Sequence, residues 1–176
     1  NLANWNPWAT TETRIPLVFG AFHYPQPWLL DIEFDENNFM IVSLADRFGF
    51  QSGNDNNGAG NFEGVSAGDL LRLSPNTGGT WDIEVNGSDG VNTTNGAGNA
   101  EGPGSGEFYF HERFELGTPT DGGAGVHREI SIAGGANVLG RGEIINGAFD
   151  PAPAGDFRTG GLIFLSNTTG QRTRSI

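Results

Sequence analysis

The chain has 176 residues, of which 29 are Gly, 36% are hydrophobic and none is Cys, and its formal charge at pH 7 is −12. That length fits one domain with a sizeable core, and 13 Phe and 4 Trp are too many for a disordered chain. The acidic balance argues against nucleic acid and against anionic membrane surfaces as partners. No run approaches the roughly 18 apolar residues that a membrane span needs, and the lack of Cys excludes a disulfide framework.

Residues 1–27 form an extended lead-in that is rich in aromatic residues and Pro. The aromatic candidates for a ligand-binding surface are Trp5, Trp8, Tyr24 and Trp28. Rigid rings bury a large area at low entropic cost, so this composition suits glycan or peptide ligands. The alternative is that the rings close the ends of a sheet.

Residues 28–85 predict a first antiparallel β-meander. Residues 28–34 and 80–85 alternate between apolar and acidic positions, as half-buried strands do, and 39–45 are almost entirely apolar. A further strand is expected over 68–74. Four short strands joined by turns resemble one blade of a β-propeller.

Within this unit, carboxylate and amide side chains separated by Gly suggest a possible Ca²⁺ site. The candidate ligands are Asp46, Asp55, Asn57 and Glu63. Their spacing departs from that of an EF-hand, and an ordinary solvated loop is the alternative. Asp46 can also end its strand by accepting backbone N–H bonds, with Arg47 covering a neighbouring sheet edge.

Residues 86–106 form a polar Gly/Asn-rich loop that is expected to contribute nothing to the core. Asn86 and Asn92 begin Asn-x-Ser/Thr triplets in this loop, which makes them glycosylation candidates. Asn167 begins a third triplet further along the chain.

Residues 107–176 predict a second β unit. Strands are expected over 107–116 and 128–134, and Phe108 and Phe110 would lie on the opposite face from Tyr109.

The last third of the chain also repeats the pattern of the first meander. Residues 143–150 align with 29–35, and 161–171 align with 40–50, so that Asn167 falls on Asp46. A third strand would begin at RTRSI, so we expect this unit to be incomplete at its C-terminus and the chain to belong to a longer protein. No convincing amphipathic helix is expected.

No catalytic motif accompanies these elements. The three His lack the H-E-x-x-H spacing of a zinc hydrolase, and no phosphate-binding loop is present. The one G-x-S-x-G string, GVSAG (64–68), leads into the strand expected over 68–74 and not into a helix, so it differs from a nucleophile elbow. Strand carboxylate pairs such as Asp31 and Glu33 can serve a glycosidase, although solvent-facing strand carboxylates are the commoner explanation. We therefore expect a protein that is not an enzyme.

Three segments, ADRFGFQ (45–51), AGDLLRL (67–73) and GGLIFLSNTTG (160–170), carry a family resemblance. Together with the strands around them, they resemble a propeller-like region of large secreted bacterial cell-surface proteins of the adhesin type, which contain B-domain repeats. The resemblance covers most of residues 28–176. It implies export, surface display and a binding or structural role, and it transfers no catalytic residue.

These observations predict an all-β fold of antiparallel four-stranded meanders, arranged as propeller-like blades with long Gly/Asn-rich loops, or alternatively a β-sandwich. The expected function is that of an extracellular surface or matrix module in adhesion or cell-envelope assembly, with other copies, other domains or glycans as partners. One alternative is a carbohydrate-binding or carbohydrate-active domain. Another is a filament subunit that is completed by strand exchange.

Overall fold

The structure is a computed structural model, and it describes residues 5–8, 15–16, 22–23, 26–52, 68–99, 102–111, 131–138, 140–149 and 160–176. These residues are mostly strand, and the strands form two four-stranded antiparallel sheets, which confirms the all-β class. Within the described part of the chain, no helix is long and apolar enough to cross a membrane.

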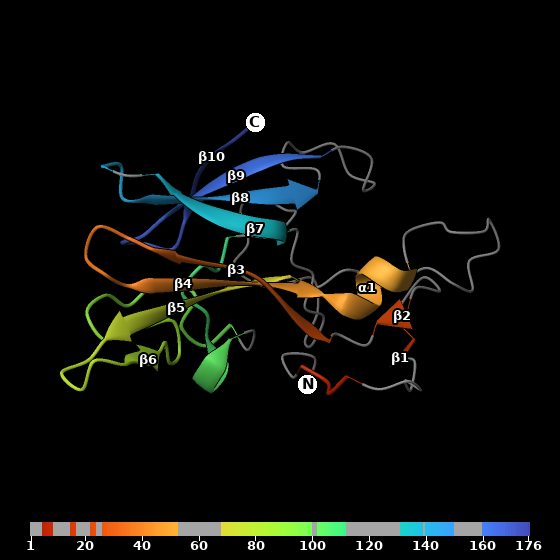
Figure 1. Ribbon diagram of the computed structural model, residues 1–176, viewed down its shortest axis with the longest axis horizontal. Helices are drawn as coiled ribbons and strands as arrows, with labels where there is room; N and C mark the ends of the chain where they lie inside the picture. The colour runs from red at the N-terminus through yellow and green to blue at the C-terminus, as the bar shows by residue number, and fades with distance from the viewer. Residues whose placement is uncertain are drawn as a thin grey trace.

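The first sheet is a meander in which each strand pairs with the next one along the chain (Figure 1). Its strands are β3 (Pro27–Phe34), β4 (Met40–Asp46), β5 (Asp69–Pro75) and β6 (Trp81–Ile83). All four were predicted, because alternation and β-branched residues mark them in the sequence.

The second sheet is also a meander, with the strands again in chain order. It consists of β7 (Ser131–Val138), β8 (Glu143–Phe149), β9 (Gly160–Ser166) and β10 (Arg172–Ser175). The strand predicted at RTRSI is therefore present as β10. Two short strands, β1 (Ile15–Pro16) and β2 (Phe22–His23), pair with each other separately.

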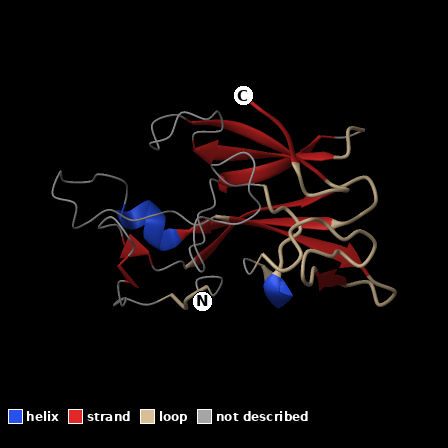
Figure 2. Cartoon of the chain, turned by 180° about the vertical axis from the view of Figure 1, so that it is seen from behind, coloured by secondary structure: helices blue, strands red, loops and turns tan. Residues whose placement is uncertain are grey.

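The two open sheets lie against each other around one core (Figure 1). β7 runs beside β3 and β4, and the buried core takes side chains from both sheets and from the segment between them. The core residues are Ile41, Leu70, Phe108, Tyr109, Ile144, Ala148, Ile163 and Leu165. Seen from behind, the loops gather mainly at one end of the sheets (Figure 2).

The predicted repeat corresponds to two hairpins of the same kind. β3 with β4, and β8 with β9, are both antiparallel pairs of consecutive strands. The chain then diverges after each hairpin. Asp46 leads into helix α1 (Arg47–Ser52), whereas Asn167 enters a turn in which Gly170 has a φ of 66°.

Two expectations about the segments outside the strands were wrong. Residues 108–111 form a turn rather than part of a strand, and Phe108 and Tyr109 are both buried. Helix α1 was not expected. The described part of the loop over 86–106 supplies none of the core residues, as expected, but it buries the polar side chains of Asp89 and Thr94 and contains a short 3-10 helix, Pro103–Ser105.

Candidate functional site

The most prominent surface feature is an apolar face on the side of the first sheet that points away from the second sheet. We call it the outer face, and ten side chains form it: Leu29, Ile32, Phe34, Met40, Val42, Leu44, Leu71, Leu73, Trp81 and Ile83. Four of them are large hydrophobic residues with 42–53% of their surface exposed, namely Leu29, Ile32, Phe34 and Ile83.

Strand register explains why these residues share one face. In an antiparallel sheet, directly paired residues point to the same side. Phe34 pairs with Met40, and Met40 pairs with Leu73. The alternate positions of β4, at Ile41 and Ala45, are buried beneath the second sheet. The nearly continuous apolar run of β4 therefore supplies both a core face and an outer face.

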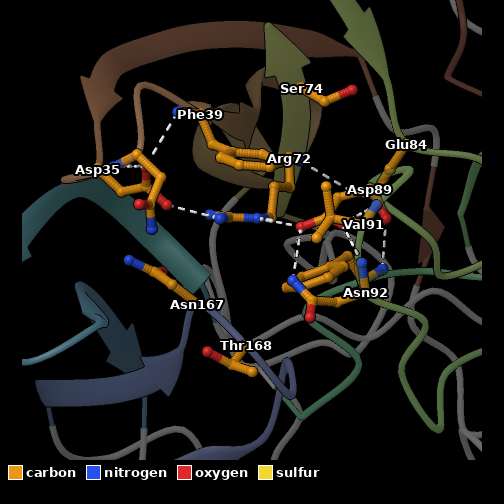
Figure 3. Close-up of polar contacts among 12 residues, drawn as sticks. Asp35, Phe39, Arg72, Ser74, Glu84, Asp89, Val91, Asn92, Asn167 and Thr168 are labelled. Atoms are coloured by element: carbon orange, nitrogen blue, oxygen red, sulfur yellow. Dashed lines mark hydrogen bonds and ion pairs between the residues drawn. The ribbon is translucent and has the colours of Figure 1, made fainter.

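Beneath the sheet, Arg72 of β5 is buried, with 2% of its surface exposed, between two carboxylates (Figure 3). Its Nη2 donates to Asp35 Oδ2 at 2.5 Å, and its Nε donates to Asp89 Oδ2 at 2.8 Å. Its guanidinium carbon lies 4.2 Å from the ring centroid of Phe39 and 5.2 Å from that of Phe108. The buried charge is thus both paired and stacked.

Both carboxylates also hold their own turns. Asp35 Oδ1 accepts the backbone N–H groups of Asn37 and Phe39, each at 2.9 Å. Asp89 Oδ1 accepts the backbone N–H groups of Val91 and Asn92. In each case one oxygen stabilises an Asx-type turn and the other binds Arg72, so a single guanidinium fixes two distant loops.

The same network reaches the second sheet through Tyr109. Arg72 Nη1 donates to Tyr109 Oη at 3.2 Å, and Tyr109 Oη donates to Asn167 Oδ1 at 2.8 Å. Burial alone would lower the pKa of Arg72, but the Tyr109 oxygen and the two carboxylates outweigh it and hold that pKa above its ordinary value. Burial raises the pKa of the Tyr109 hydroxyl. Arg72 is therefore a permanent cation that joins the two layers.

Asp69, Glu84 and Glu107 are among the further acidic groups that lie inside the fold. Glu84 Oε1 accepts the backbone N–H of Arg72 at 2.9 Å, and Oε2 accepts that of Phe108. Its carboxylate thereby takes the place of a strand partner at the edge of β5. Burial raises the pKa of Glu84 to about 8, and it raises the pKa of Asp69, which bonds with Glu107 and Trp5, to about 7.

The predicted aromatic residues do not gather at one described site. Trp8 is 60% exposed, its Nε1 donates to Pro27 O at 2.7 Å, and the Arg47 guanidinium lies 5.1 Å from its ring centroid. Trp28 is 44% exposed and meets Phe50 of α1 edge-on. Trp5 instead bonds with the buried Asp69, and Tyr24 lies outside the described residues.

The predicted Ca²⁺ ligands are described only at Asp46. Its Oδ1 accepts the backbone N–H of Gln26 at 3.0 Å and that of Phe48 at 2.9 Å, which is the strand-ending role considered as the alternative. Asp55, Asn57 and Glu63 lie outside the described residues. Over the part of the chain that is described, no cluster of three or more His, Asp or Glu side chains is arranged to hold a metal ion.

The two glycosylation candidates lie in ordered backbone. Asn86 is exposed with a φ of 53°, and its side-chain oxygen accepts the N–H of Gly98 at 2.8 Å. Asn92 is half-buried and bonds with Asp89. Attachment of a glycan at either residue stays a prediction.

Comparison with known proteins found no matching family model, no matching curated protein and no matching solved structure.

Two central features were missed in the sequence. Arg72 carries a weak signal, because a lone Arg between Leu residues in GDLLRLS alternates with the apolar outer positions and so points into the core. The outer face has a clearer signal in the sequence. A strand that is apolar at most positions on both of its sides, as β4 is, favours a covering layer on both sides.

Proposed function

We propose that this chain is a non-enzymatic extracellular surface or matrix module that acts in adhesion or cell-envelope assembly. Its two sheets form a rigid scaffold, and its first sheet docks against another protein surface through the outer face. In that setting the two meanders would be neighbouring blade-like units of a larger array, as the resemblance to adhesin-type propeller regions implies.

The outer face is the observation that carries this proposal. Ten apolar side chains from four strands form it, and four of the large ones keep 42–53% of their surface exposed. A contiguous apolar patch of this kind is uncommon on a protein that works alone and is typical of an interaction surface. Assembly against another surface would remove it from water.

The use of the buried charged groups supports a structural role. Arg72, Asp35 and Asp89 are closed off from solvent, and each holds turns or strands in place. Glu84, whose pKa is among the most strongly raised, is 1% exposed, and both of its oxygens accept backbone N–H groups. Groups with these tasks stabilise the scaffold that presents the outer face.

Retention on isolated cell envelopes of the source organism tests the proposal. We would compare the labelled chain with Ile32→Asp, which places a carboxylate on the outer face, and with Val91→Asp, which makes the same change on a loop residue that is 76% exposed. The expected result is at least a fivefold loss of retention for Ile32→Asp alone, since one desolvated carboxylate costs well over 1 kcal/mol. No retention of the parent chain, or equal retention of both variants, would contradict the proposal.

A carbohydrate-binding role is the second candidate, and Trp8 is the observation that favours it. Its indole is exposed, yet a hydrogen bond to Pro27 and the Arg47 guanidinium fix its orientation. A rigid exposed ring can stack on a sugar. Affinity electrophoresis in polysaccharide gels tests it. Trp8→Ala should abolish retardation by a bound polysaccharide, Val91→Ala should preserve it, and an unretarded parent chain would remove this candidate.

A further inference from the structure

We infer that the outer face is occupied by the outer face of a second copy of this chain, in a closed two-fold dimer. This inference rests on the proposed function, because it names the partner of the same surface. Three properties of the described surfaces support it: the match of the outer face with itself, its area and its lack of charged side chains.

The first argument concerns which surface could cover the outer face. The second sheet offers no equal partner among its described residues. There Phe164 is 7% exposed beneath the Arg174 guanidinium, which lies 3.8 Å from its ring centroid, and the exposed large hydrophobics are Leu162 and the terminal Ile176. Within the described chain, only the outer face itself matches the outer face in size and chemistry.

A surface that pairs with itself closes on a two-fold axis. Head-to-tail stacking, which would build a filament, requires two different complementary surfaces. The described residues supply only one such surface, so the geometry points to a dimer that ends its growth after one contact.

The second argument concerns area. A whole side chain has an area of about 150–250 Å² if it is aromatic and somewhat less if it is not. Because four of the ten are 42–53% exposed and the other six are half-buried, together they present roughly 500 Å² of apolar surface to solvent. A standard interface buries about 800 Å² on each partner, of which about 57% is apolar. The outer face therefore provides about the apolar share that one side of a stable dimer needs.

The third argument concerns charge. The ten outer-face positions carry no charge, because the acidic residues of the edge strands β3 and β6, namely Asp31, Glu33 and Asp82, alternate with them and point to the other side of the sheet. Covering this uncharged face desolvates no ion, although each copy carries a formal charge of −12, so that two copies repel each other at longer range. Salt screens that repulsion, so added salt should strengthen the dimer. A basic partner would show the opposite dependence.

Sedimentation velocity of the intact chain tests the inference, between about 1 and 200 µM protein and at about 0.05 and 0.5 M salt. We expect a species of twice 18.7 kDa that is favoured by salt. Ile32→Asp should weaken dimerisation at least tenfold, because it buries a carboxylate in each copy, and Val91→Asp should change it less than twofold. Thermal unfolding of each variant confirms that the fold is retained.

Cross-linking provides a second readout that does not depend on affinity. The chain has no Cys, so a single thiol introduced by Ile32→Cys can be joined by a flexible bis-maleimide only to another copy. We expect covalent dimers from Ile32→Cys and at least fivefold fewer from Val91→Cys.

The dimer would be overturned by a chain that stays monomeric at every concentration and salt level. It would also be overturned if Ile32→Asp and Val91→Asp weakened dimerisation equally. Higher species that grow with concentration would indicate a filament and would overturn it as well. The proposed function fails on a different result, namely the absence of envelope retention or equal retention of both Asp variants. Envelope retention that depends on Ile32 in a monomeric chain would leave the docking face intact and assign it to a different partner.

Discussion

Arg72 is the residue on which the packing of the two layers depends most. Its guanidinium contacts the turn after β3 through Asp35 and the loop after β6 through Asp89 (Figure 3). It also reaches the second sheet through Tyr109. Removing one partner of a buried ion pair leaves an uncompensated charge, which costs more than the pair itself contributes.

Arg72→Met is therefore expected to lower the free energy of unfolding by about 3–5 kcal/mol, because Asp35 and Asp89 stay buried without their cation. Arg174→Met is the matched control, since Arg174 also pairs with a carboxylate, Glu143, at 3.1 Å and also covers a Phe ring, but its side chain is 40% exposed. Its cost should be about 0–1 kcal/mol. Urea unfolding measures both, and equal losses for the two variants would contradict the network described here.

Two buried acids predict that stability falls as the pH rises from mildly acidic values. The pKa of Asp69 is raised from 3.8 to about 7, and that of Glu84 is raised from 4.5 to about 8, in both cases by burial. The folded state thus holds protons that the unfolded state has released. The stabilisation that Asp69 and Glu84 contribute is complete below their ordinary pKa values, and it is lost as the pH rises through their raised pKa values.

Asp89 acts in the opposite direction at lower pH. Although burial opposes it, bonds from Asn92, Arg72 and Val91 lower the pKa of Asp89 below 3.8. Its stabilisation is lost as the pH falls through that lowered value. The free energy of unfolding should therefore be highest near about pH 4, close to the ordinary pKa values of these acids, and should fall on either side.

Urea unfolding at about pH 5 and about pH 8.5 tests the alkaline side of this dependence. Asp69→Asn should reduce the slope of the free energy of unfolding against pH by the equivalent of about one bound proton. Asp82→Asn, at an exposed position in the same sheet, should leave that slope unchanged. Stability that increases over this interval would show that the buried acids are ionised in the native state without cost.

Among the elements, the hairpins were predictable and their surroundings were not. Alternation in WLLDIEF and TWDIEV locates β3 and β6, because a period of two is a local property. It does not decide which side is buried: Ile32 and Ile83 are 45% and 46% exposed, whereas Glu84, expected to face outward, is 1% exposed. The role of residues 86–106 depends on distant partners. Asp89 accepts a hydrogen bond from Arg72, and the Thr94 hydroxyl donates to the backbone carbonyl of Glu107 at 3.3 Å. Composition alone made this segment resemble a solvated loop.

Glycine in these connections serves close packing as well as turning. A Cβ added at Gly170 would lie 1.7 Å from the carbonyl oxygen of Phe108, and the residue has a φ of 66°. The turn after β9 therefore rests directly on the backbone of the core segment, which only Gly permits.

Gly170→Ala should accordingly destabilise the fold by about 3 kcal/mol or more, from both the clash and the backbone conformation. Gly160→Ala is the control, because a Cβ there meets nothing within 4 Å and its φ is not in the left-handed region. That change should stay within about 1 kcal/mol and tend to stabilise. Thermal unfolding distinguishes them, and a tolerated Gly170→Ala would mean that this turn does not pack as described.

For the whole molecule, the layer arrangement decides which apolar residues form the core and which form a surface. The sequence indicates that β4 is apolar on both sides, but it does not indicate that the second sheet covers only one of them. The same limit applies to the aromatic lead-in. Trp5, Trp8 and Trp28 share a composition, yet Trp5 bonds with a buried acid while the other two stay exposed.

The central claim is that the outer face is open in the isolated chain and becomes covered on assembly. The most direct test is the rate at which a maleimide labels the single thiol of Ile32→Cys, compared with that of Val91→Cys, first in dilute and then in concentrated protein. We predict rates within about tenfold of each other in dilute protein, because Ile32 is 45% exposed, and selective slowing of Ile32→Cys as the concentration rises. Slow labelling at position 32 that does not change with protein concentration would show that the chain covers this face itself, and would contradict the account.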